Sequence, residues 1–382
     1  MQRFPLEVRP PGRHRFGAET PFRLGVEEEL LLADRESLGL APVTERVLAT
    51  AHSSPGRLKG ELSDGMIELA TEIVAGASDA VAVLATLRER VRATGVGLLG
   101  AGLHPTASFD DVMHRRGLRY AAIGDDTRGL LRITPHCGLH VHVGMPDAES
   151  AIRACNGMHR WIPLLLALSA NSPYWHGRDS GLASARTVIS HSMPRSRSGV
   201  PRRFRDYDDY CATVDRICRA AAIPDYTMIW WDLRPHPSLG TLEVRCLDAQ
   251  TELRNVAGLV ALTHCLVVHE AITEPPSSSP APEVVAEAIF RALRDGRAAE
   301  LDLDGRQLPV AEIARQALEI AHAVARSLGG EDLLEHVEDI LAAGNGADRQ
   351  RAAHATGGMP AVLRAVAIDP NRNRVAEVAA SA

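Results

Sequence analysis

Residues 24–32 constrain the fold more than any other stretch, because they place charged side chains inside an otherwise apolar run. The run reads Leu-Gly-Val-Glu-Glu-Glu-Leu-Leu-Leu, which is typical of a strand. Strand side chains alternate between two faces, so Glu27 and Glu29 must share one face and Glu28 must lie on the other. An isolated acidic pair of this kind usually belongs to a solvated face. Whether this pair does so depends on the rest of the chain.

Residues 138–144 form the clearest predicted strand. The sequence Gly-Leu-His-Val-His-Val-Gly alternates strictly, which places His140 and His142 on one face and three apolar side chains on the other. Two histidines at this spacing are more often hydrogen-bonded or solvated than bound to a metal. Glutamates on the same face of neighbouring strands favour metal ligation instead.

Three further strand-like runs carry the other acidic candidates for the site. Residues 57–63 and 66–74 are separated by Ser-Asp-Gly, a hairpin-type turn signal. Residues 241–247 are predicted to pair with residues 227–233, across a connection that begins at Arg234. The candidate site residues on these runs are Glu61, Glu68, Glu243 and Arg245.

If these strands lie in one sheet with coinciding faces, five carboxylates and two imidazoles converge on a small volume. Two unit charges about 5 Å apart repel by roughly 3 kcal/mol at an effective dielectric constant of about 20. Such a cluster requires bound cations or raised pKa values. Oxygen-rich ligation favours Mg²⁺ or Mn²⁺ over zinc, and one histidine is compatible with either ion. The predicted metal ligands are Glu27, Glu29, Glu61, Glu68, His140, His142 and Glu243.

Magnesium held by carboxylates typically serves the phosphates of a nucleotide. The chain contains no G-x-x-x-x-G-K-[ST] motif, since its one lysine, Lys59, is followed by Gly-Glu, and no G-x-G-x-x-G opens a predicted helix. ATP would therefore be held by metal ions and by guanidinium groups, whose planar forks match phosphate and carboxylate oxygens. The candidate arginines are Arg186, Arg234 and Arg245.

Composition narrows the class of protein. With 382 residues, of which 45% are hydrophobic, the chain can bury a large core. A net charge of −6 argues against a nucleic-acid partner. Six cysteines without C-x-x-C spacing are typical of reduced thiols, and we expect Cys137 to be buried and inert. The most apolar segment, residues 161–170, is shorter than the about 20 residues of a membrane span. The N-terminus lacks a secretory signal, so we expect a soluble, cytoplasmic protein.

Strands that occur as hairpins between helices favour an α+β domain with a largely antiparallel sheet. This domain is predicted over residues 20–370, between an N-terminal arm (1–19) and a tail (371–382). A short strand is expected at residues 98–103, a loop-rich segment at 171–201 and a linker-like stretch at 274–282. Helices are expected at residues 44–51, 78–94, 148–170, 207–222, 251–272, 282–293, 310–328 and 331–342.

Three local features remain open to more than one interpretation. The arginine-rich run from Arg195 to Arg205 is either a mobile, solvated loop or a flap over a substrate. Trp230 and Trp231 are expected in the core rather than as a stacking platform. Ser78 is expected to cap the helix that follows it.

Five motifs, in this order along the chain, resemble the type 2 glutamate-cysteine ligase family of carboxylate-amine ligases. They are GVEEEL at 25–30, ELSDGMIELAT at 61–71, GLHVHVG at 138–144, LASAR at 182–186 and WDLRPHPSLGTLEVR at 231–245. The resemblance implies a glutamine-synthetase-like catalytic domain, in which ATP and divalent cations sit on a curved, largely antiparallel sheet with flanking helices. It implies metal and nucleotide positions at Glu27, Glu29, Glu61, Glu68, His140 and Glu243, and phosphate or carboxylate contacts at Arg186, Arg234 and Arg245.

The implied reaction is ATP-dependent activation of a carboxylate as an acyl phosphate, followed by attack of an amine. Glutamate and cysteine are the default amino-acid substrates, and a homodimer is the expected assembly. Two other functions stay open on the sequence, namely phosphorylation of a guanidino group by a related fold and a metal- or nucleotide-binding regulatory protein without turnover. Hydrolysis at the two histidines is a weaker alternative.

Overall fold

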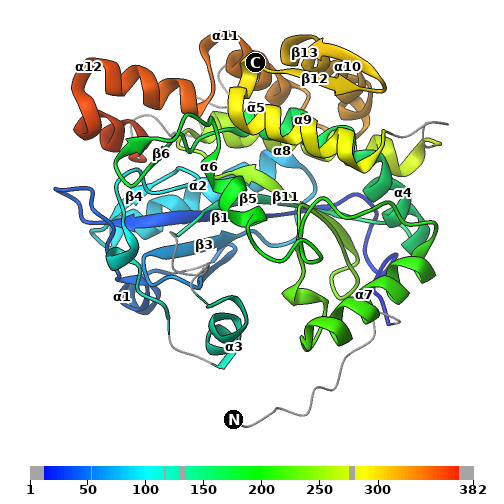
Figure 1. Ribbon diagram of the computed structural model, residues 1–382, viewed down its shortest axis with the longest axis horizontal. Coiled ribbons are helices and arrows are strands. Elements are labelled where there is room, and N and C mark those ends of the chain that lie inside the picture. The colour runs from blue at the N-terminus through cyan, green and yellow to red at the C-terminus, as the bar shows by residue number, and fades with distance from the viewer. Residues whose placement is uncertain (1–12, 53, 116–117, 129–134, 275–279, 370–382) are drawn as a thin grey trace.

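The centre of the computed structural model is a seven-stranded antiparallel sheet (Figure 1). The structure describes residues 13–52, 54–115, 118–128, 135–274 and 280–369. The strand order is β10-β11-β5-β1-β3-β2, and β4 also pairs with β1. The strands are β1 (Leu24–Ala33), β2 (Arg57–Gly60), β3 (Met66–Ala70), β4 (Gly97–Leu99), β5 (Gly138–Gly144), β10 (Leu233–His236) and β11 (Thr241–Asp248). The predicted α+β class with an antiparallel sheet is confirmed.

β1 holds the sheet together because it pairs with three other strands. Its first half lies against β5, its middle and second half against β3, and its last three residues against β4. The register places Glu27 opposite His140 and Glu29 opposite Glu68. Residues directly opposite on an antiparallel pair present their side chains on the same face. The polar residues of separate strands are therefore neighbours.

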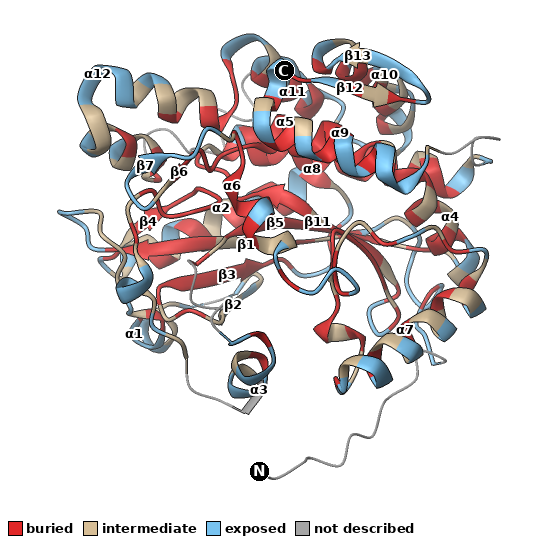
Figure 2. Ribbon diagram, viewed as in Figure 1, coloured by how far each residue is buried: buried red, intermediate tan, exposed pale blue. Residues whose placement is uncertain are grey.

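Helices cover the apolar face of the sheet in two layers (Figure 1). The inner layer consists of α2 (Ala77–Ala93), α4 (Ala148–Met158), α5 (Ile162–Ser169) and α8 (Leu253–Ile272). Over it pack α9 (Pro282–Asp295), α10 (Val310–Leu328) and α11 (Glu335–Ala343), with α12 (Gly346–Val366) at one end. Figure 2 shows that buried residues continue from the sheet into the inner helices, so the two share one core.

α8 is the central helix of this core. In the described part of the chain it is the one helix long and apolar enough to cross a membrane, and 89% of its apolar window is buried inside the molecule. Its hydrophobicity extends around the whole helix because sheet and helices surround it.

The other face of the sheet is less covered. α3 (Leu118–Thr127) and α7 (Tyr207–Ala221) lie on the side opposite α5, α8 and α9 in Figure 1. α6 (Ala185–His191) contacts β11. The remaining elements are α1 (Thr44–Thr50), β6 (Tyr174–Trp175), β7 (Arg178–Asp179), β8 (Ser198–Gly199), β9 (Trp230–Trp231), β12 (Glu300–Leu303) and β13 (Arg306–Pro309).

Several predicted helix boundaries are wrong. The helix expected at 148–170 is two helices, α4 and α5, separated by a turn at residues 159–161. Pro163 lies in the first turn of α5, where its missing N–H is no loss. Ser78 lies inside α2, and Gly76 occupies the cap position. α11 begins at Glu335, after a short 3₁₀ turn at Asp332–Leu334.

Several predicted strand boundaries also need correction. β2 ends at Gly60 rather than at residue 63, and β4 ends at Leu99 rather than at residue 103. Arg234 lies inside β10 rather than in a connection, which gives its side chain a fixed direction. The segment 171–201 contains α6, the two-stranded β6–β7 sheet and strand β8 of another small sheet, so it is more ordered than the predicted loop.

The predicted domain boundaries stay predictions. Residues 1–12 of the arm, 275–279 of the linker-like stretch and 370–382 at the C-terminal end lie outside the described residues.

Glu28 lies on the apolar face of β1, where it is fully buried and paired. Both of its oxygens accept from the Arg88 guanidinium of α2, one of them from Nε at 2.8 Å. Arg88 also donates to the carbonyl oxygens of Gln250 and Thr251, at 2.8 and 3.0 Å. The pair therefore ties the central strand to a helix and to the loop that precedes α8.

Removal of the Glu28 carboxylate should destabilise the fold. We expect Glu28→Ala to lower the free energy of unfolding by about 3–5 kcal/mol, because it leaves a buried guanidinium without its counter-charge. Glu89→Ala, which breaks an exposed ion pair with Arg92 on the same helix, should cost no more than about 1 kcal/mol. Urea unfolding followed by circular dichroism measures both values. Equal costs would contradict the assigned role of the buried pair.

Candidate active site

A cavity of about 300 Å³ opens on the polar face of the sheet. Eight of the ten residues predicted from the sequence line it, and they are Glu27, Glu29, Glu61, Glu68, His140, Arg186, Arg234 and Arg245. The other two, His142 and Glu243, are buried beside it and contact cavity residues. The predicted convergence of these strands is therefore confirmed, whereas the roles of the individual residues stay predictions.

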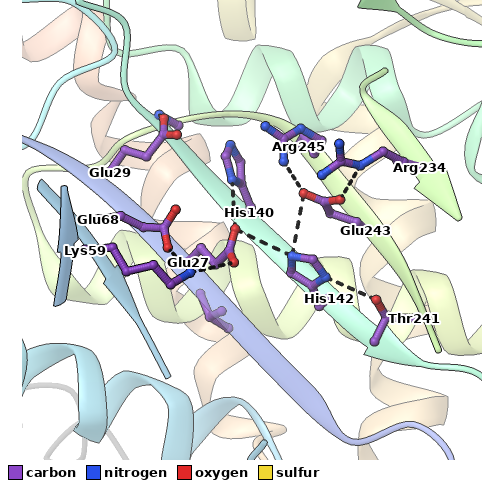
Figure 3. Close-up of polar contacts among 12 residues, drawn as sticks. Glu27, Glu29, Lys59, Glu68, His140, His142, Arg234, Thr241, Glu243 and Arg245 are labelled. Atoms are coloured by element: carbon purple, nitrogen blue, oxygen red, sulfur yellow. Dashed lines mark hydrogen bonds and ion pairs between the residues drawn. The ribbon is translucent and has the colours of Figure 1, made fainter. Parts of the chain in front are cut away.

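Cross-strand register creates this arrangement. His142 of β5 lies opposite Glu243 of β11, and Glu243 in turn lies opposite Arg234 of β10. Together with the Glu27–His140 and Glu29–Glu68 pairs, these positions form a continuous row of ionisable side chains across five strands (Figure 3).

Glu243 is fully buried and compensated on both oxygens. It accepts from Arg234 Nε at 2.7 Å and from Arg245, and His142 Nε2 lies 3.5 Å away. Burial alone would raise the pKa of Glu243, but the charges of Arg234 and Arg245 outweigh it and hold the pKa well below its usual range. Burial likewise acts to lower the pKa of His142, but the charge of Glu243 and the contacts with Glu27 raise it.

One group of donor atoms at this end has the spacing of a metal site. Atoms of Glu27, His142 and Glu243 lie within 4.8 Å of one another. Two guanidinium groups already bind Glu243, however, so its carboxylate serves first to hold Arg234 and Arg245 in place. His142 is fixed by Thr241, whose Oγ1 lies 3.1 Å from Nδ1.

The opposite end of the row carries more negative charge than positive charge. Burial, followed by the charges of Glu29 and Glu68, raises the pKa of Glu61 well above its usual range. Glu29 accepts a hydrogen bond from the Gly138 amide at 2.7 Å. The repulsion among these carboxylates is therefore only partly relieved by protein groups.

Lys59 supplies part of the missing positive charge. It lies directly opposite Glu68 in the β2–β3 pair, with Nζ 2.6 Å from Glu68 and 3.8 Å from Glu27 (Figure 3). Sequence reasoning missed this residue because it considered Lys59 only as part of a phosphate-binding loop. The signal was the alternation of Lys59 and Glu61, which places both side chains on one face of a strand.

The donor set fits a hard divalent cation. Four carboxylates line the acidic end of the cavity, and the buried Nε2 atom of His140 has no hydrogen-bond partner within the described residues. Burial acts to raise the pKa of Glu27, but hydrogen bonds and charges from His140 and His142 hold it well below its usual range, so Glu27 is ionised. Carboxylate oxygen donors with a single imidazole suit Mg²⁺ or Mn²⁺.

Arg186 reaches the cavity from the first turn of α6. Its amide donates to Ser172 Oγ at 3.1 Å, and its Nη1 donates to the Cys246 carbonyl at 3.0 Å. Its Nε is buried without a hydrogen-bond partner in the described structure. Gly138 leaves room for this guanidinium, since a Cβ there would meet Arg186 and lie 2.8 Å from His140 Nε2.

The remaining wall of the cavity is mostly apolar and aromatic, with Tyr120, Ile123, Met193, Thr227, Trp230 and Asp232 among its residues. The interpretation of both tryptophans as core is confirmed for Trp231 and only in part for Trp230, which packs against the core from outside it. Trp231 is buried, whereas Trp230 is half-buried, lines the cavity and carries the Arg197 guanidinium 5.5 Å from its ring centre.

Two further predictions can be compared with the structure. Cys137 is fully buried, and burial raises the pKa of its thiol well above the usual range, as expected of an inert cysteine. Within the arginine-rich run, Arg197 is buried and lies 2.6 Å from Asp126 of α3. This contact argues against a freely solvated loop at Arg197, and the flap stays a prediction.

Replacement of Lys59 should increase the affinity of the acidic end for cations. We expect Lys59→Met to tighten Mn²⁺ binding roughly fivefold. The partly exposed ammonium group competes with the cation for the same carboxylates, and this competition weakens the free energy of Mn²⁺ binding by about 1 kcal/mol. The same variant should melt at a lower temperature than the parent without metal. Calorimetric Mn²⁺ titration and thermal melting measure the two effects.

Arg57→Met is the matched control for Lys59→Met. Arg57 lies two residues earlier on the same face of β2 and is exposed, so its loss removes one positive charge without touching the cavity. Equal changes in Mn²⁺ affinity in the two variants would mean that net charge, rather than the Lys59 contacts, sets the affinity.

The chain resembles one family of known proteins over most of its length. Residues 23–365 match the family model described as Glutamate-cysteine ligase family 2 (GCS2). A Rubrobacter xylanophilus protein named "Putative glutamate--cysteine ligase 2-3" is 40% identical over 347 residues, which cover 88% of this chain and 94% of that protein. A Natronomonas pharaonis protein named "Glutamate--cysteine ligase" is 33% identical over 355 residues, which cover 91% and 95%.

A solved structure shares the fold. The glutamate–cysteine ligase of Francisella tularensis in complex with AMP superimposes with a TM-score of 0.69 and 13% sequence identity. The match covers 91% of this chain and 88% of that one.

Proposed function

The chain belongs to glutamate-cysteine ligase family 2. We propose that it is an ATP-dependent carboxylate–amine ligase that acts through an acyl phosphate. The observation that carries the proposal is the cavity itself, which is lined by four carboxylates at its acidic end and by three arginines. That combination suits a polyphosphate held through cations and a carboxylate held through guanidinium groups. The shared fold of a ligase bound to AMP supports a nucleotide at this site.

In this proposal the acidic end of the cavity holds Mg²⁺. Glu27, Glu29, Glu61, Glu68 and His140 are its candidate ligands, because they supply oxygen donors and one free imidazole nitrogen. When bound, the ion neutralises phosphate oxygens and orients the transferring phosphoryl group. The protein's contribution is the rigid sheet, which fixes the donors before any substrate arrives.

The arginines would stabilise the charge that develops during the reaction. Arg234 and Arg245 are held by Glu243, and Arg186 is held by backbone carbonyl oxygens, so their positions are fixed in advance. Because these donors are already in place, little reorganisation of the protein is needed when the phosphoryl group is transferred and the acyl phosphate forms between them. The ligase reaction needs no protein nucleophile, and the inert Cys137 agrees with that.

The proposed substrates are amino acids. Glutamate is the default carboxylate and cysteine the default amine, as the names of the relatives suggest. ATP and Mg²⁺ are the proposed cofactors.

Glu29 and Glu28 provide a direct test, since they are adjacent but lie on opposite faces of β1. We expect Glu29→Gln to lower kcat/KM for Mg²⁺-dependent ADP release about 100-fold or more, because it removes a charged ligand from the site. Glu28→Gln should lower the melting temperature while changing kcat/KM far less, because Glu28 pairs with Arg88 in the core. A panel of carboxylates and amines supplies the substrates, and ADP release is followed at a temperature where both variants are folded.

The products decide between the ligase and its alternatives. An amide that forms only with ATP supports the proposal. A phosphorylated guanidine without an amide, ATP-independent hydrolysis of an amide, or unchanged turnover in Glu29→Gln would contradict it.

A further inference from the structure

Asp232 is the one carboxylate among the described cavity-lining residues that lies outside the acidic end. It follows β9, on the wall that also contains Thr227 and Trp230. Its side chain is almost fully buried, and its Oδ2 lies 2.9 Å from Nε2 of His191, the last residue of α6. The cavity therefore has a second, smaller acidic position with a histidine behind it.

The main chain of Asp232 is fixed independently of its side chain. Its amide donates to the Gly199 carbonyl at 2.9 Å, and its carbonyl accepts from the Arg245 amide at 2.8 Å. The carboxylate is thus not required to attach this segment to its neighbours. Burial acts to lower the pKa of His191, but the Asp232 charge raises it, so the two side chains form an ion pair. This pair fixes the orientation of the Asp232 carboxylate.

Ligase chemistry requires the amine substrate to lose a proton before it attacks. The amine substrate is an ammonium ion at neutral pH and has no free electron pair until it loses a proton. The carboxylates at the other end are assigned to the cation in the proposed function. An anion on the opposite wall can attract the ammonium group and take its proton.

We propose that Asp232, oriented by His191, binds the ammonium form of the amine substrate and accepts its first proton. This inference rests on the proposed ligase function. Asp232 would be a catalytic residue because it touches the reacting nitrogen, and His191 would be a positioning residue because it acts through Asp232.

In the proposed reaction each bond that forms is matched by one that breaks, and each proton has an acceptor. The substrate carboxylate attacks the γ-phosphorus of ATP, and ADP leaves with the electron pair of the broken P–O bond. Asp232 takes one proton from the ammonium group, and the free amine attacks the acyl carbon. The bond from that carbon to the phosphate oxygen breaks, and the second nitrogen proton leaves with the phosphate. Asp232 then returns its proton to solvent.

Hydroxylamine separates a catalytic role of Asp232 from a structural one. It is largely uncharged at neutral pH, so it can attack an acyl phosphate without prior loss of a proton and give a hydroxamate. We expect Asp232→Asn to lower amide formation from the amine at least about 100-fold while hydroxamate formation stays within about threefold of the parent. His191→Gln should give the same pattern with a smaller loss.

Asp339→Asn is the control for the substitution itself. Asp339 also pairs with a histidine, His336, at 3.4 Å, but it does not line the cavity. We expect this variant to retain both reactions. Circular dichroism and thermal melting establish that each variant is folded, and His191→Gln provides the test if Asp232→Asn is not.

The possible results separate the two proposals. If the parent forms neither amide nor hydroxamate with any carboxylate, the ligase function itself is contradicted. If the parent forms both and a folded Asp232→Asn loses both equally, or keeps its amide formation, the role of Asp232 is overturned. Loss of amide alone supports that role.

Discussion

Repulsion among carboxylates on one face of the central sheet is the constraint on which the rest of the site depends. A row of ionisable residues crosses five strands because backbone register places them side by side. At one end Glu243 is compensated by two arginines and a histidine, which fixes those arginines at the cavity wall. At the other end a single ammonium group faces four carboxylates, which leaves room for a divalent cation.

The same strand also anchors the fold. β1 presents Glu27 and Glu29 to the cavity. Glu28, which lies between them, points to the other face of the strand and pairs with Arg88 in the core. The site therefore rests on the strand that pairs with three others in the sheet, with two layers of helices behind it. Rigid support of this kind holds the candidate metal-binding side chains and the arginines in place before a substrate or cation binds.

Period-two alternation made the faces predictable from the sequence, because it depends only on neighbouring residues. It placed Glu27 with Glu29, His140 with His142 and Glu243 with Arg245 on shared faces of their own strands, and Glu28 on the opposite face of its strand. Register is not visible in this way, so the Lys59–Glu68 pairing was missed. The turn that divides residues 148–170, the Trp230 contact with the cavity and the His191–Asp232 pair depend on tertiary packing, which local patterns do not encode.

A crystal structure with Mn²⁺ and a non-hydrolysable ATP analogue tests the central claim most directly. Anomalous scattering from manganese should give a peak in the cavity, within coordination distance of Glu27, Glu29, Glu61, Glu68 or His140, with the analogue's phosphates against the arginine end. Manganese or nucleotide bound elsewhere on the chain, with the acidic row unchanged, would contradict the assignment of this face as the catalytic site.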